Sequence, residues 1–396
     1  MEGAMILPLI LLTIAILSAA TAVYGTLPQW SLFHSGIHVI ETTRQLQWPL
    51  LTLSVLMCVA IVVSIIIGKR RVWWLIGFAP VLALFAQLFV TGTFANLQVV
   101  DHPPAVSAAD ATSFMKDDEY VVGLVADEQT YAFPYRQLFS HPVVVLQVRE
   151  KQVVLMWNAF ANRAVARSMG RQVVPRELEV VSMPSNALLI YNTRVGQFIN
   201  GLTGLTPEGT VPGGFHAAVP TAKMTWGQWR GRYPQTLVMS MPALNKAPAG
   251  PIRPRYPMRV DKTALPLPAE TQVLVFATTR PVAVAENAVT EQPINVSVGD
   301  EPVVVFRDPA SGRVKAFERT FDGRSSRFLA NPSLLRAVKG VFMLDAATNS
   351  GWTSAGVAVD GEKEVIGKRL QPVAIEEGLY FGVMREWYPE MELVAP

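Results

Sequence analysis

The sequence has a single cysteine, Cys58, among its 396 residues. An intrachain disulfide, a Cys-x-x-Cys redox pair and a cysteine-based zinc site each require at least two thiols. The sequence therefore excludes all three. The lack of disulfides does not locate the chain, because a domain with a large hydrophobic core is stable without them.

Charged residues are also scarce. They make up 16% of the chain, against about 25% in ordinary soluble domains. The shortfall is concentrated in the first hundred positions, where the charged residues are Glu2, Glu41, Arg44, Lys69, Arg70 and Arg71. The net charge of +3 is small. Beyond the first hundred residues, the sequence has no cluster of Lys and Arg with interleaved aromatic residues. We therefore expect no nucleic-acid partner.

Common catalytic signatures are missing as well. The sequence contains no Gly-x-Ser-x-Gly, His-Glu-x-x-His, Walker A or Gly-x-Gly-x-x-Gly element. These motifs position nucleophiles, zinc ligands and phosphate-binding backbone groups, so their absence removes the most direct arguments for hydrolase, zinc-protease and nucleotide chemistry. We expect no cofactor.

Long apolar runs are present near the N-terminus, at about 5–24, 49–67 and 72–94. Each is close to the roughly 20 residues that cross about 30 Å of hydrocarbon. None contains a charged residue, which would cost about 2.5–3.5 kcal/mol or more at the bilayer centre. We predict a three-helix transmembrane region over 1–98, with the lipid bilayer as its partner. The alternative is a buried helical bundle of a soluble protein.

The first run has small residues at 18–20 and 22 that resemble a signal-peptide cleavage region. Signal peptides usually begin with positive charge, whereas this chain begins Met-Glu-Gly-Ala. An uncleaved helix is favoured over a cleaved signal.

The loops predict an orientation. Lys69, Arg70 and Arg71 lie between the second and third runs, whereas Arg44 is the only Lys or Arg between the first and second. Short positive loops stay in the cytoplasm. We therefore predict a multi-pass protein of the cytoplasmic (inner) membrane, with everything after about Asn96 on the extracytoplasmic, periplasmic side. An aromatic belt is predicted from Trp30, Trp48, Trp73 and Trp74.

Two histidines lie between the first and second runs, in a segment that could be partly helical. His34 and His38 are four positions apart and would share one face of a helix. Such a pair could bind a metal or haem, but no third ligand is visible nearby. A polar interfacial face is the alternative.

The pattern changes at about Val99. Short apolar stretches rich in β-branched and aromatic residues alternate with polar, Gly or Pro segments, which is typical of strands. The clearest are 120–125, 142–148, 152–157 and 187–191. The sequence predicts a mainly β region with some α+β character, including a short helix at about 108–116 capped by Ser107.

The second half of this region is similar to the first. Segments 273–276, 280–284 and 301–306 match 121–124, 129–133 and 153–156. Each half also ends in a Trp followed by Tyr-Pro and a strand. We predict two repeats, 99–243 and 268–396, with chance similarity between β segments as the alternative. The Pro-rich linker 244–267 between them could lie over the surface or grip a partner.

Several short motifs resemble one family. They include Ser107–Ala111, Asp117–Gly123, Tyr131–Arg136, His141, Ser185-Asn186, Tyr191-Asn192, Trp226 to Pro234 and Asp345–Trp352. Together they resemble the "domain of unknown function 3179" proteins of bacteria and archaea. The resemblance covers the region after the apolar runs and none of the runs themselves.

One stretch departs from that family. Where its members have Tyr-Cys-Pro-Leu-Cys-Gly, this chain has Trp-Asn-Ala-Phe-Ala-Asn at 157–162, and the second repeat has Phe-Arg-Asp-Pro at 306–309. If the family's chemistry uses these cysteines as thiolates or metal ligands, this chain lacks the groups for it.

Polar candidates for a site remain. Arg136 and His141 could form a ligand pocket or a catalytic pair, or His141 could serve a structural hydrogen-bonding role. Asp345, Thr348, Ser350 and Trp352 form a polar-aromatic cluster that could bind a ligand or stabilise a turn. Asn192 occupies the matching turn of the first repeat.

We conclude from the sequence that the chain is a non-catalytic, membrane-anchored extracytoplasmic module, an accessory subunit or binding protein with protein partners in a membrane complex. The alternative is an enzyme or metal protein with a polar site around His141, Arg136 and Asp345.

Overall fold

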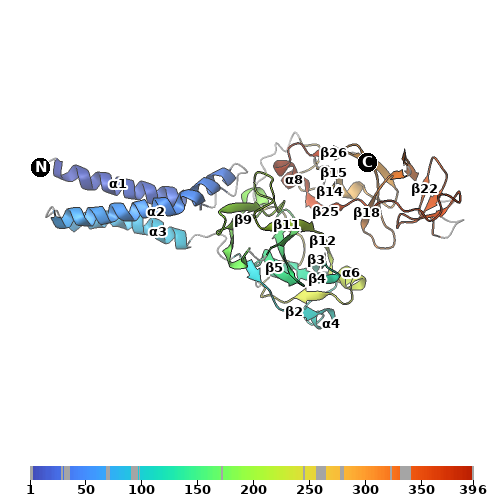
Figure 1. Cartoon of the computed structure of the whole chain (residues 1–396), viewed down its shortest axis with the longest axis horizontal. Helices are drawn as coiled ribbons and strands as arrows, with labels where there is room; N and C mark the ends of the chain where they lie inside the picture. The colour runs from blue at the N-terminus through green and yellow to red at the C-terminus, as the bar shows by residue number, and fades with distance from the viewer. Residues whose placement is uncertain are drawn as a thin grey trace. The chain divides into compact units, whose positions relative to one another are not determined.

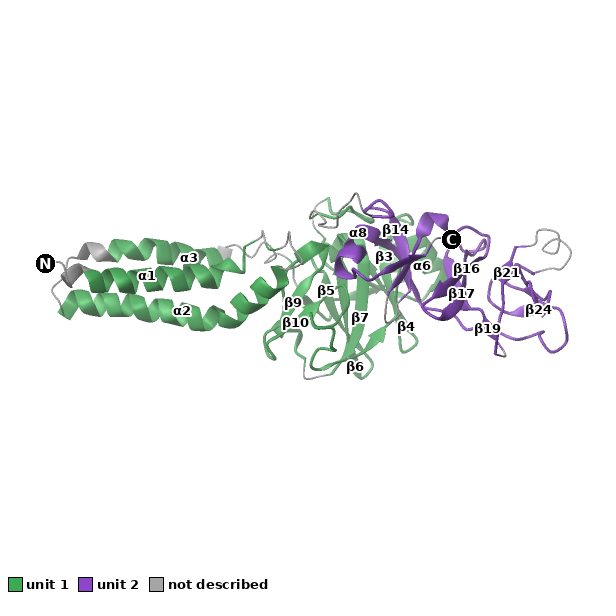
Figure 2. Cartoon of the chain, turned by 90° about the horizontal axis from the view of Figure 1, so that it is seen from above, with its two compact units in different colours: residues 1–257 green, residues 258–396 purple. Residues whose placement is uncertain are grey.

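The structure, a computed structural model, describes residues 3–27, 30, 36–67, 72–90, 97, 99–170, 173–243, 246–255, 265–276, 281–321, 323–330 and 340–394. The order of helices and strands is shown in Figure 1. The chain divides into two compact units, residues 1–257 and 258–396 (Figure 2). Lys69, Arg70 and Arg71 of the predicted cytoplasmic turn lie outside the described residues.

Unit 1 begins with apolar helices: α1 (Gly3–Tyr24), α2 (Gly36–Ile67), the 3₁₀ helix η2 (Val72–Gly77) and α3 (Phe78–Val90). Two segments are long and apolar enough to cross a membrane, Ile6–Tyr24 and Gly36–Ile67. The third apolar helical segment, Leu75–Leu88, is shorter than the usual spanning length. The helical part of this run continues without a break from Val72 to Val90 as η2 and α3, within the predicted range 72–94.

Helix α2 starts well before the predicted apolar run and continues through Pro49. Positions 36–48 are more polar than the rest of the helix, so hydropathy alone shows only the later part. His38 lies in this polar section with an exposed side chain, and its Nδ1 is 3.6 Å from the Glu41 carboxylate.

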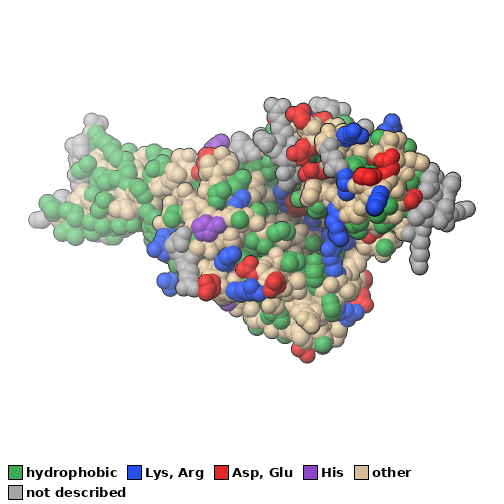
Figure 3. Space-filling model, turned by 45° about the vertical axis from the view of Figure 1, so that its right-hand side comes forward, with side chains coloured by type: hydrophobic (Ala, Val, Ile, Leu, Met, Phe, Trp, Pro, Cys, Tyr) green, Lys and Arg blue, Asp and Glu red, His purple; other side chains and the backbone are tan. Residues whose placement is uncertain are grey.

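The helices pack through small residues. Ala15, Ala19 and Ala22 of α1 are buried, and the Ser54 hydroxyl of α2 donates to the Ala15 carbonyl at 2.9 Å. Small side chains let helix backbones approach closely. Large apolar side chains lie on the outside, for example Ile66 at 71% and Ile76 at 73% exposed (Figure 3). A water-soluble bundle buries such side chains, so this pattern suggests association with a membrane.

After the helices, the described chain is mainly β. A five-stranded sheet of unit 1 has the order β12-β3-β4-β13-β2. Its strands are β12 (Thr221–Thr225), β3 (Tyr120–Ala126), β4 (Gln129–Pro134), β13 (Leu237–Met239) and β2 (Ala105–Ser107). Strand β2 leads into α4 (Ala108–Ala111), which is shorter than predicted, and Ser107 caps it by accepting from the Asp110 N–H.

Helix α6 (Trp226–Arg232) connects β12 to β13. Thr225 and Gln228 form a capping box at its start, which satisfies N–H groups left free at a helix N-terminus. The Trp229 ring packs against β3 at Gly123, where an added Cβ would lie 2.2 Å from the ring. Only glycine fits at this position.

A second five-stranded sheet has the order β1-β5-β6-β7-β11, and a three-stranded sheet has the order β10-β9-β8. The strands are β1 (Val99–Asp101), β5 (Val143–Val148), β6 (Lys151–Asn158), β7 (Arg163–Met169), β11 (Phe215–Val219), β8 (Leu178–Ser182), β9 (Leu189–Asn192) and β10 (Gln197–Asn200). Short helices η3 (Pro175–Glu177), η4 (Pro184–Asn186) and α5 (Tyr135–Leu138) join them.

Strands β5 and β6 contribute to two cores. Leu155 and Trp157 pack with β3 and β4, whereas Val154 and Met156 pack with Leu188 and other residues around β8–β10. Because successive side chains of a strand point to opposite faces, this sheet is the middle layer of three. Burial on both faces explains why its strands are nearly continuous apolar runs.

Unit 2 has a sheet of order β25-β14-β15-β26. It also has a meander of β16, β17 and β18, a β19–β20 hairpin, a sheet of β21 to β24, and the short helices η5 and α8. The bounds are β14 (Gln272–Phe276), β15 (Val282–Ala285), η5 (Glu286–Ala288), β16 (Ile294–Val298), β17 (Glu301–Arg307), β18 (Val314–Glu318), β19 (Thr320–Phe321), β20 (Arg324–Ser325), β21 (Phe328–Leu329), β22 (Met343–Asp345), β23 (Gly351–Trp352), β24 (Ala358–Asp360), β25 (Ile375–Tyr380), α8 (Phe381–Trp387) and β26 (Glu392–Val394).

Strand pairing follows the same scheme in both units. In unit 1, β3 pairs antiparallel with β4 and β12, and β4 pairs parallel with β13. In unit 2, β14 pairs antiparallel with β15 and β25, and β15 pairs parallel with β26. Helices α6 and α8 make the corresponding connections, from β12 to β13 and from β25 to β26.

Candidate functional site

Unit 1 contains a cavity of about 340 Å³ at the ends of several connections, which we call the Trp157 cavity. Its apolar wall comes from the end of α5, the turn after β6 and the connection between β8 and β9. The main wall residues are Leu138, Phe139, Trp157, Phe160, Met183 and Leu188. Leu97, in the chain that follows α3, completes one side.

The wall of the Trp157 cavity is largely buried. Leu138, Trp157 and Leu188 are almost completely inaccessible. Among the described lining residues the only charged ones are Lys246 and Arg255, and both are exposed. The indole N–H of Trp157 is buried and has no hydrogen-bond partner among the described residues. Unpaired buried donors are uncommon.

The segment 246–255, which follows β13, lies along this cavity; two hydrogen bonds attach it to the β region, and a third attaches the chain just before it. Just before it, the Met241 N–H donates to the Gln137 side chain at 3.0 Å. Within it, the Ala249 carbonyl accepts from the Tyr120 N–H at 2.7 Å. At its end, the Arg255 N–H donates to the Asn186 side chain at 2.9 Å. The last of these bonds holds Arg255 at the cavity.

The connection that carries Met183 and Leu188 has a strained backbone. Ser185 and Asn186 have φ values of 47° and 66° and are fully buried. Left-handed conformations cost a non-glycine residue about 1–3 kcal/mol and are kept where the surroundings enforce them. Here the turn places two wall residues and supplies the amide oxygen that holds Arg255.

Arg136 and His141, both predicted site residues, do not line the Trp157 cavity. Arg136 forms an ion pair with Glu119 at 2.9 Å. His141 is buried, with Nδ1 at 3.0 Å from the Ser140 hydroxyl and 3.2 Å from the Gln137 carbonyl. His141 therefore contacts Gln137, whose side chain accepts from the Met241 N–H just before segment 246–255.

Asp345, Thr348, Ser350 and Trp352 do come together, in the turn between β22 and β23. Asp345 accepts from the Ala347 N–H at 3.0 Å and from the Thr348 hydroxyl at 2.6 Å. The Thr348 and Ser350 hydroxyls are 2.7 Å apart, and the Trp352 indole donates to Ser350 at 2.9 Å. The cluster is thus engaged with itself and its own backbone, and it belongs to unit 2, whereas Arg136 and His141 belong to unit 1.

The turn after β9 has the same form. Asn192 accepts from the Arg194 N–H at 3.1 Å, as Asp345 does from Ala347. In each turn the carbonyl of the first residue also accepts an N–H four positions later, at 2.9 Å and 2.8 Å. Asn192 and Asp345 therefore make the same two kinds of hydrogen bond, each in the turn that follows its strand.

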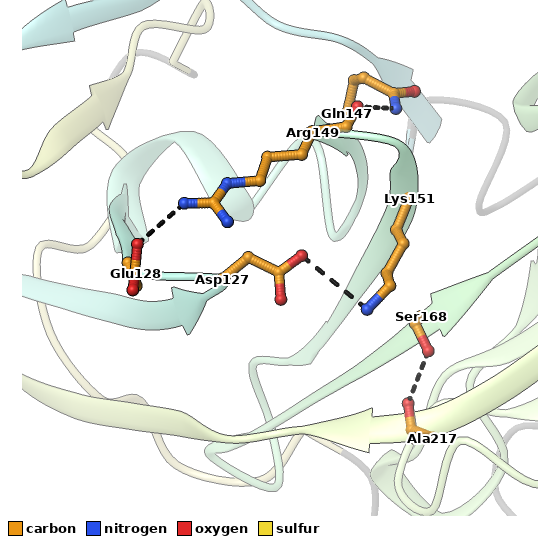
Figure 4. Close-up of polar contacts among 7 residues, drawn as sticks. All are labelled: Asp127, Glu128, Gln147, Arg149, Lys151, Ser168 and Ala217. Carbon is orange, nitrogen blue, oxygen red and sulfur yellow. Dashed lines mark hydrogen bonds and ion pairs between the residues drawn. The ribbon is translucent and has the colours of Figure 1, made fainter.

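A second cavity of about 500 Å³, the Lys151 cavity, lies beside the hairpin turns of β3–β4 and β5–β6. Figure 4 shows two ion pairs at these hairpin turns: Arg149 contacts Glu128 at 2.9 Å, and Lys151 contacts Asp127 at 3.9 Å. On the other side, the Ser168 hydroxyl of β7 donates to the Ala217 carbonyl of β11 at 3.3 Å. The described acidic and basic residues that line this cavity are Asp127, Glu150 and Lys151, so both signs of charge are present.

Among the described residues, no group of three or more His, Cys, Asp or Glu side chains could hold a metal ion. His38 has Glu41 beside it, and His34 lies outside the described residues.

The comparison with protein families gives one match. The model of the family described as "Protein of unknown function (DUF3179)" matches residues 97–390. The chain belongs to this family. Comparisons with curated proteins and with solved structures found no match. The predicted family is thus confirmed, and the DUF3179 region begins at the residue that lines the Trp157 cavity next to the helices.

Within the DUF3179 region, the stretch 157–162 forms the end of β6, the turn after it and part of the cavity wall. Asn158, where the family pattern has its first cysteine, is fully buried. Its side chain accepts from the Leu188 N–H at 2.6 Å and donates to the Gly201 and Arg163 carbonyls at 2.7 and 3.4 Å. Ala161, at the second cysteine, is also fully buried. An amide that bonds three backbone groups has a structural role.

The corresponding turn of unit 2 is stabilised by charge. Asp308, after β17, contacts the Lys315 ammonium at 3.0 Å and accepts from the Ser311 hydroxyl at 2.6 Å. Burial would raise the pKa of Asp308, but hydrogen bonds from Ser311, Lys315 and Ser354 and the charge of Lys315 outweigh it and lower the pKa to about 2. The carboxylate is therefore ionised throughout the physiological range, as a structural ion pair requires.

Sequence reasoning missed the Trp157 cavity. Its apolar wall residues come from positions between 97 and 248, and each has the character of an ordinary core residue. The signal that was available is the Ser185-Asn186 motif, which the structure places between two wall residues, together with the basic residues of the Pro-rich segment.

Proposed function

We propose that the chain is a non-catalytic, membrane-anchored binding protein, an accessory component of a membrane complex, with the Trp157 cavity as its ligand site. The observation that carries this proposal is the character of the wall. None of the described lining residues is Ser, Thr, Cys, His, Asp or Glu, so the cavity has no acid–base pair or hydroxyl or thiol nucleophile. A mostly apolar cavity with a few polar groups is the usual form of a small-molecule site.

The local contacts of the predicted polar residues also favour binding over catalysis. Arg136 is held by Glu119, His141 by Ser140 and Gln137, and Asp345 by its own turn. Groups engaged in this way stabilise loops. They also support the reading of unit 1 and unit 2 as two copies of one module, because the strand pairing and the Asn192 and Asp345 turns correspond.

A contact of α2 supports a multi-pass topology. Arg44 forms an ion pair with Glu179 of β8 and lies 5.4 Å from the centroid of the Tyr191 ring. Arg44 is then on the same side of the membrane as the β region. Between Arg44 and Val99 the chain must cross an even number of times, which α2 and α3 supply as two crossings. The positive turn at 69–71 then favours an extracytoplasmic β region.

Cysteine labelling tests this topology. In a Cys58→Ser background, we expect Asp300→Cys to react with a membrane-impermeant maleimide in intact spheroplasts. Lys69→Cys should react only after the membrane is permeabilised. Labelling of Asp300→Cys solely after permeabilisation would place the β region in the cytoplasm and remove the extracytoplasmic role.

Photolabelling tests the ligand site. The full chain in lipid nanodiscs is irradiated with a long-chain fatty alcohol that carries a diazirine, and labelled peptides are mapped by mass spectrometry. We expect labels on peptides with Phe160 or Leu188, and at least a fivefold loss in Ala159→Phe, which fills the cavity. Ala217→Phe, at the Lys151 cavity, is the matched control and should label as the wild type does. Labels confined to the apolar helices would contradict the proposal.

A further inference from the structure

We propose that the outer edge of β26, in unit 2, binds an extended basic strand of a protein partner. The inference rests on the proposed role in a membrane complex, and it names the surface and the chemistry of the partner. It does not involve the Trp157 cavity. Three observations carry it: an edge whose counterpart in unit 1 has a covering strand, backbone groups that face outward from that edge, and acidic side chains beside them.

The edge of β26 differs from its counterpart in unit 1. There, β13 pairs with β4 on one side and antiparallel with β2 on the other. In unit 2, β26 pairs with β15 on one side, and no strand of the described chain pairs with its other side (Figure 1). A strand edge of this kind can pair with a strand of another chain. The β13–β2 pair of unit 1 shows how such a strand fits.

Burial differs between the two strands in the same sense. Both begin three residues after a Tyr-Pro pair, so Val238 and Met239 correspond to Leu393 and Val394. Val238 and Met239 are almost completely inaccessible, whereas Leu393 and Val394 are half-buried. In unit 1, Val106 of β2 belongs to the same core cluster as Val238. A partner strand with a β-branched residue opposite Leu393 would bury that side chain in the same way.

Leu393 directs its backbone groups toward the open side. The Glu392 N–H donates to the Pro281 carbonyl at 3.1 Å, on the side of β15. Since the backbone groups of successive residues in a strand point to opposite sides, the N–H and C=O of Leu393 face away from β15. The equivalent residue of unit 1, Val238, pairs with Val106 of β2. The edge of β26 therefore offers a donor and an acceptor to an antiparallel strand.

The side chains at this edge are acidic. Glu390 and Glu392 are exposed, and neither forms an ion pair within the part of the chain that the structure describes. The equivalent positions of unit 1 hold Gln235 and Leu237. The nearby Arg385 donates to a backbone carbonyl. Opposite charges stabilise adjacent strands and like charges destabilise them. The edge therefore favours a strand with Lys or Arg, and a second copy of β26 would bring more acidic side chains instead.

The test uses the full chain in nanodiscs and two fluorescently labelled peptides. One has the sequence of residues 103–109, which includes β2, and the other carries Ala105→Lys and Ser107→Lys in that sequence. Fluorescence anisotropy measures the affinity, and hydrogen exchange at the Leu393 amide locates the binding. We expect the basic peptide to slow this exchange and to bind about tenfold more tightly than the other peptide. The basic peptide with an N-methylated Val106 lacks the central donor and should not bind.

Variants of the chain make the test specific. Leu393→Pro removes the outward N–H, and an edge strand tolerates proline where its N–H faces solvent. The basic peptide should bind Leu393→Pro about fivefold more weakly than Leu393→Ala, which keeps the N–H. Glu390→Gln/Glu392→Gln leaves the backbone intact and should abolish the preference for the basic peptide. The matched control Glu362→Gln/Glu364→Gln changes two other exposed acids of unit 2 and should keep that preference.

The outcomes separate this inference from the proposed ligand site. Protection of the Leu393 amide in the monomeric chain without peptide would show that the chain itself covers the edge, and would overturn the inference. A dimer, seen by mass photometry, that Leu393→Pro dissociates would assign the edge to a second copy and would also overturn it. Unchanged binding of the N-methylated peptide would do the same. None of these results changes photolabelling of the Trp157 cavity, so the ligand site depends on its own test.

Discussion

Replacing Asn158 by alanine is expected to lower the free energy of unfolding by about 3–5 kcal/mol. The side chain is fully buried and bonds the Leu188 N–H and the Gly201 and Arg163 carbonyls. Each buried group left without a partner costs about 1–3 kcal/mol. Chemical denaturation in mild detergent, followed by tryptophan fluorescence, measures the loss.

Two further variants make the test specific. Asn287→Ala changes an exposed asparagine of η5 and should alter stability by less than about 0.5 kcal/mol. Asn158→Cys restores the residue of the family pattern but not the three bonds, so its cost should lie within about 1 kcal/mol of that of alanine. A loss under about 1 kcal/mol for Asn158→Ala would show that the amide does not hold the turn.

Asn158 thus has a structural role at the position where the sequence resemblance predicts a cysteine. The turn after β6 joins the middle sheet to the β8–β10 sheet, because Asn158 reaches both Leu188 and Gly201. In unit 2 the equivalent turn uses Asp308 and Lys315 instead. Both solutions fix a turn, and neither supplies a nucleophile. In unit 1 the turn after β6 lines the Trp157 cavity, whose described lining is apolar apart from Lys246 and Arg255.

Much of the fold could be predicted because its signals are local. The middle sheet is buried on both faces, so β5 and β6 are unbroken apolar runs that any scan detects. The short helices α6 and α8 were not predicted, since seven residues are too few for a helical period to show. The start of α2 at Gly36 was seen only as a possibility, because its polar residues hide it from hydropathy.

The site could not be predicted in the same way. Cavity residues such as Leu138, Met183 and Leu188 are chemically ordinary, and only the fold shows that the space between them is unfilled. The polar candidates were easy to find because their residue types are conspicuous. Those conspicuous residues, His141 and Asp345 among them, turn out to bond their own surroundings. Residue type therefore drew attention to polar groups that bond their surroundings, whereas the cavity depended on packing between distant segments.

The Asp345 turn gives the sharpest distinction between a structural and a catalytic carboxylate. Asp345→Ala should lower the free energy of unfolding by about 2–4 kcal/mol, because Ala347 loses its acceptor and the half-buried hydroxyl of Thr348 loses one. Asp345→Asn should cost less than about 1 kcal/mol, since Asn192 already serves the same turn in unit 1. The reciprocal Asn192→Asp should be equally mild.

Hydrogen exchange of the peptide spanning 343–352, together with the denaturation midpoint, measures these effects. A structural turn tolerates the amide, because the amide keeps the oxygen that accepts the Ala347 N–H. A carboxylate needed as an acid, a base or a metal ligand does not, because the amide has no ionisable proton and binds metals weakly. If Asp345→Asn proved as damaging as Asp345→Ala, the negative charge itself would be required. The alternative of a chemical site in unit 2 would then replace the structural interpretation.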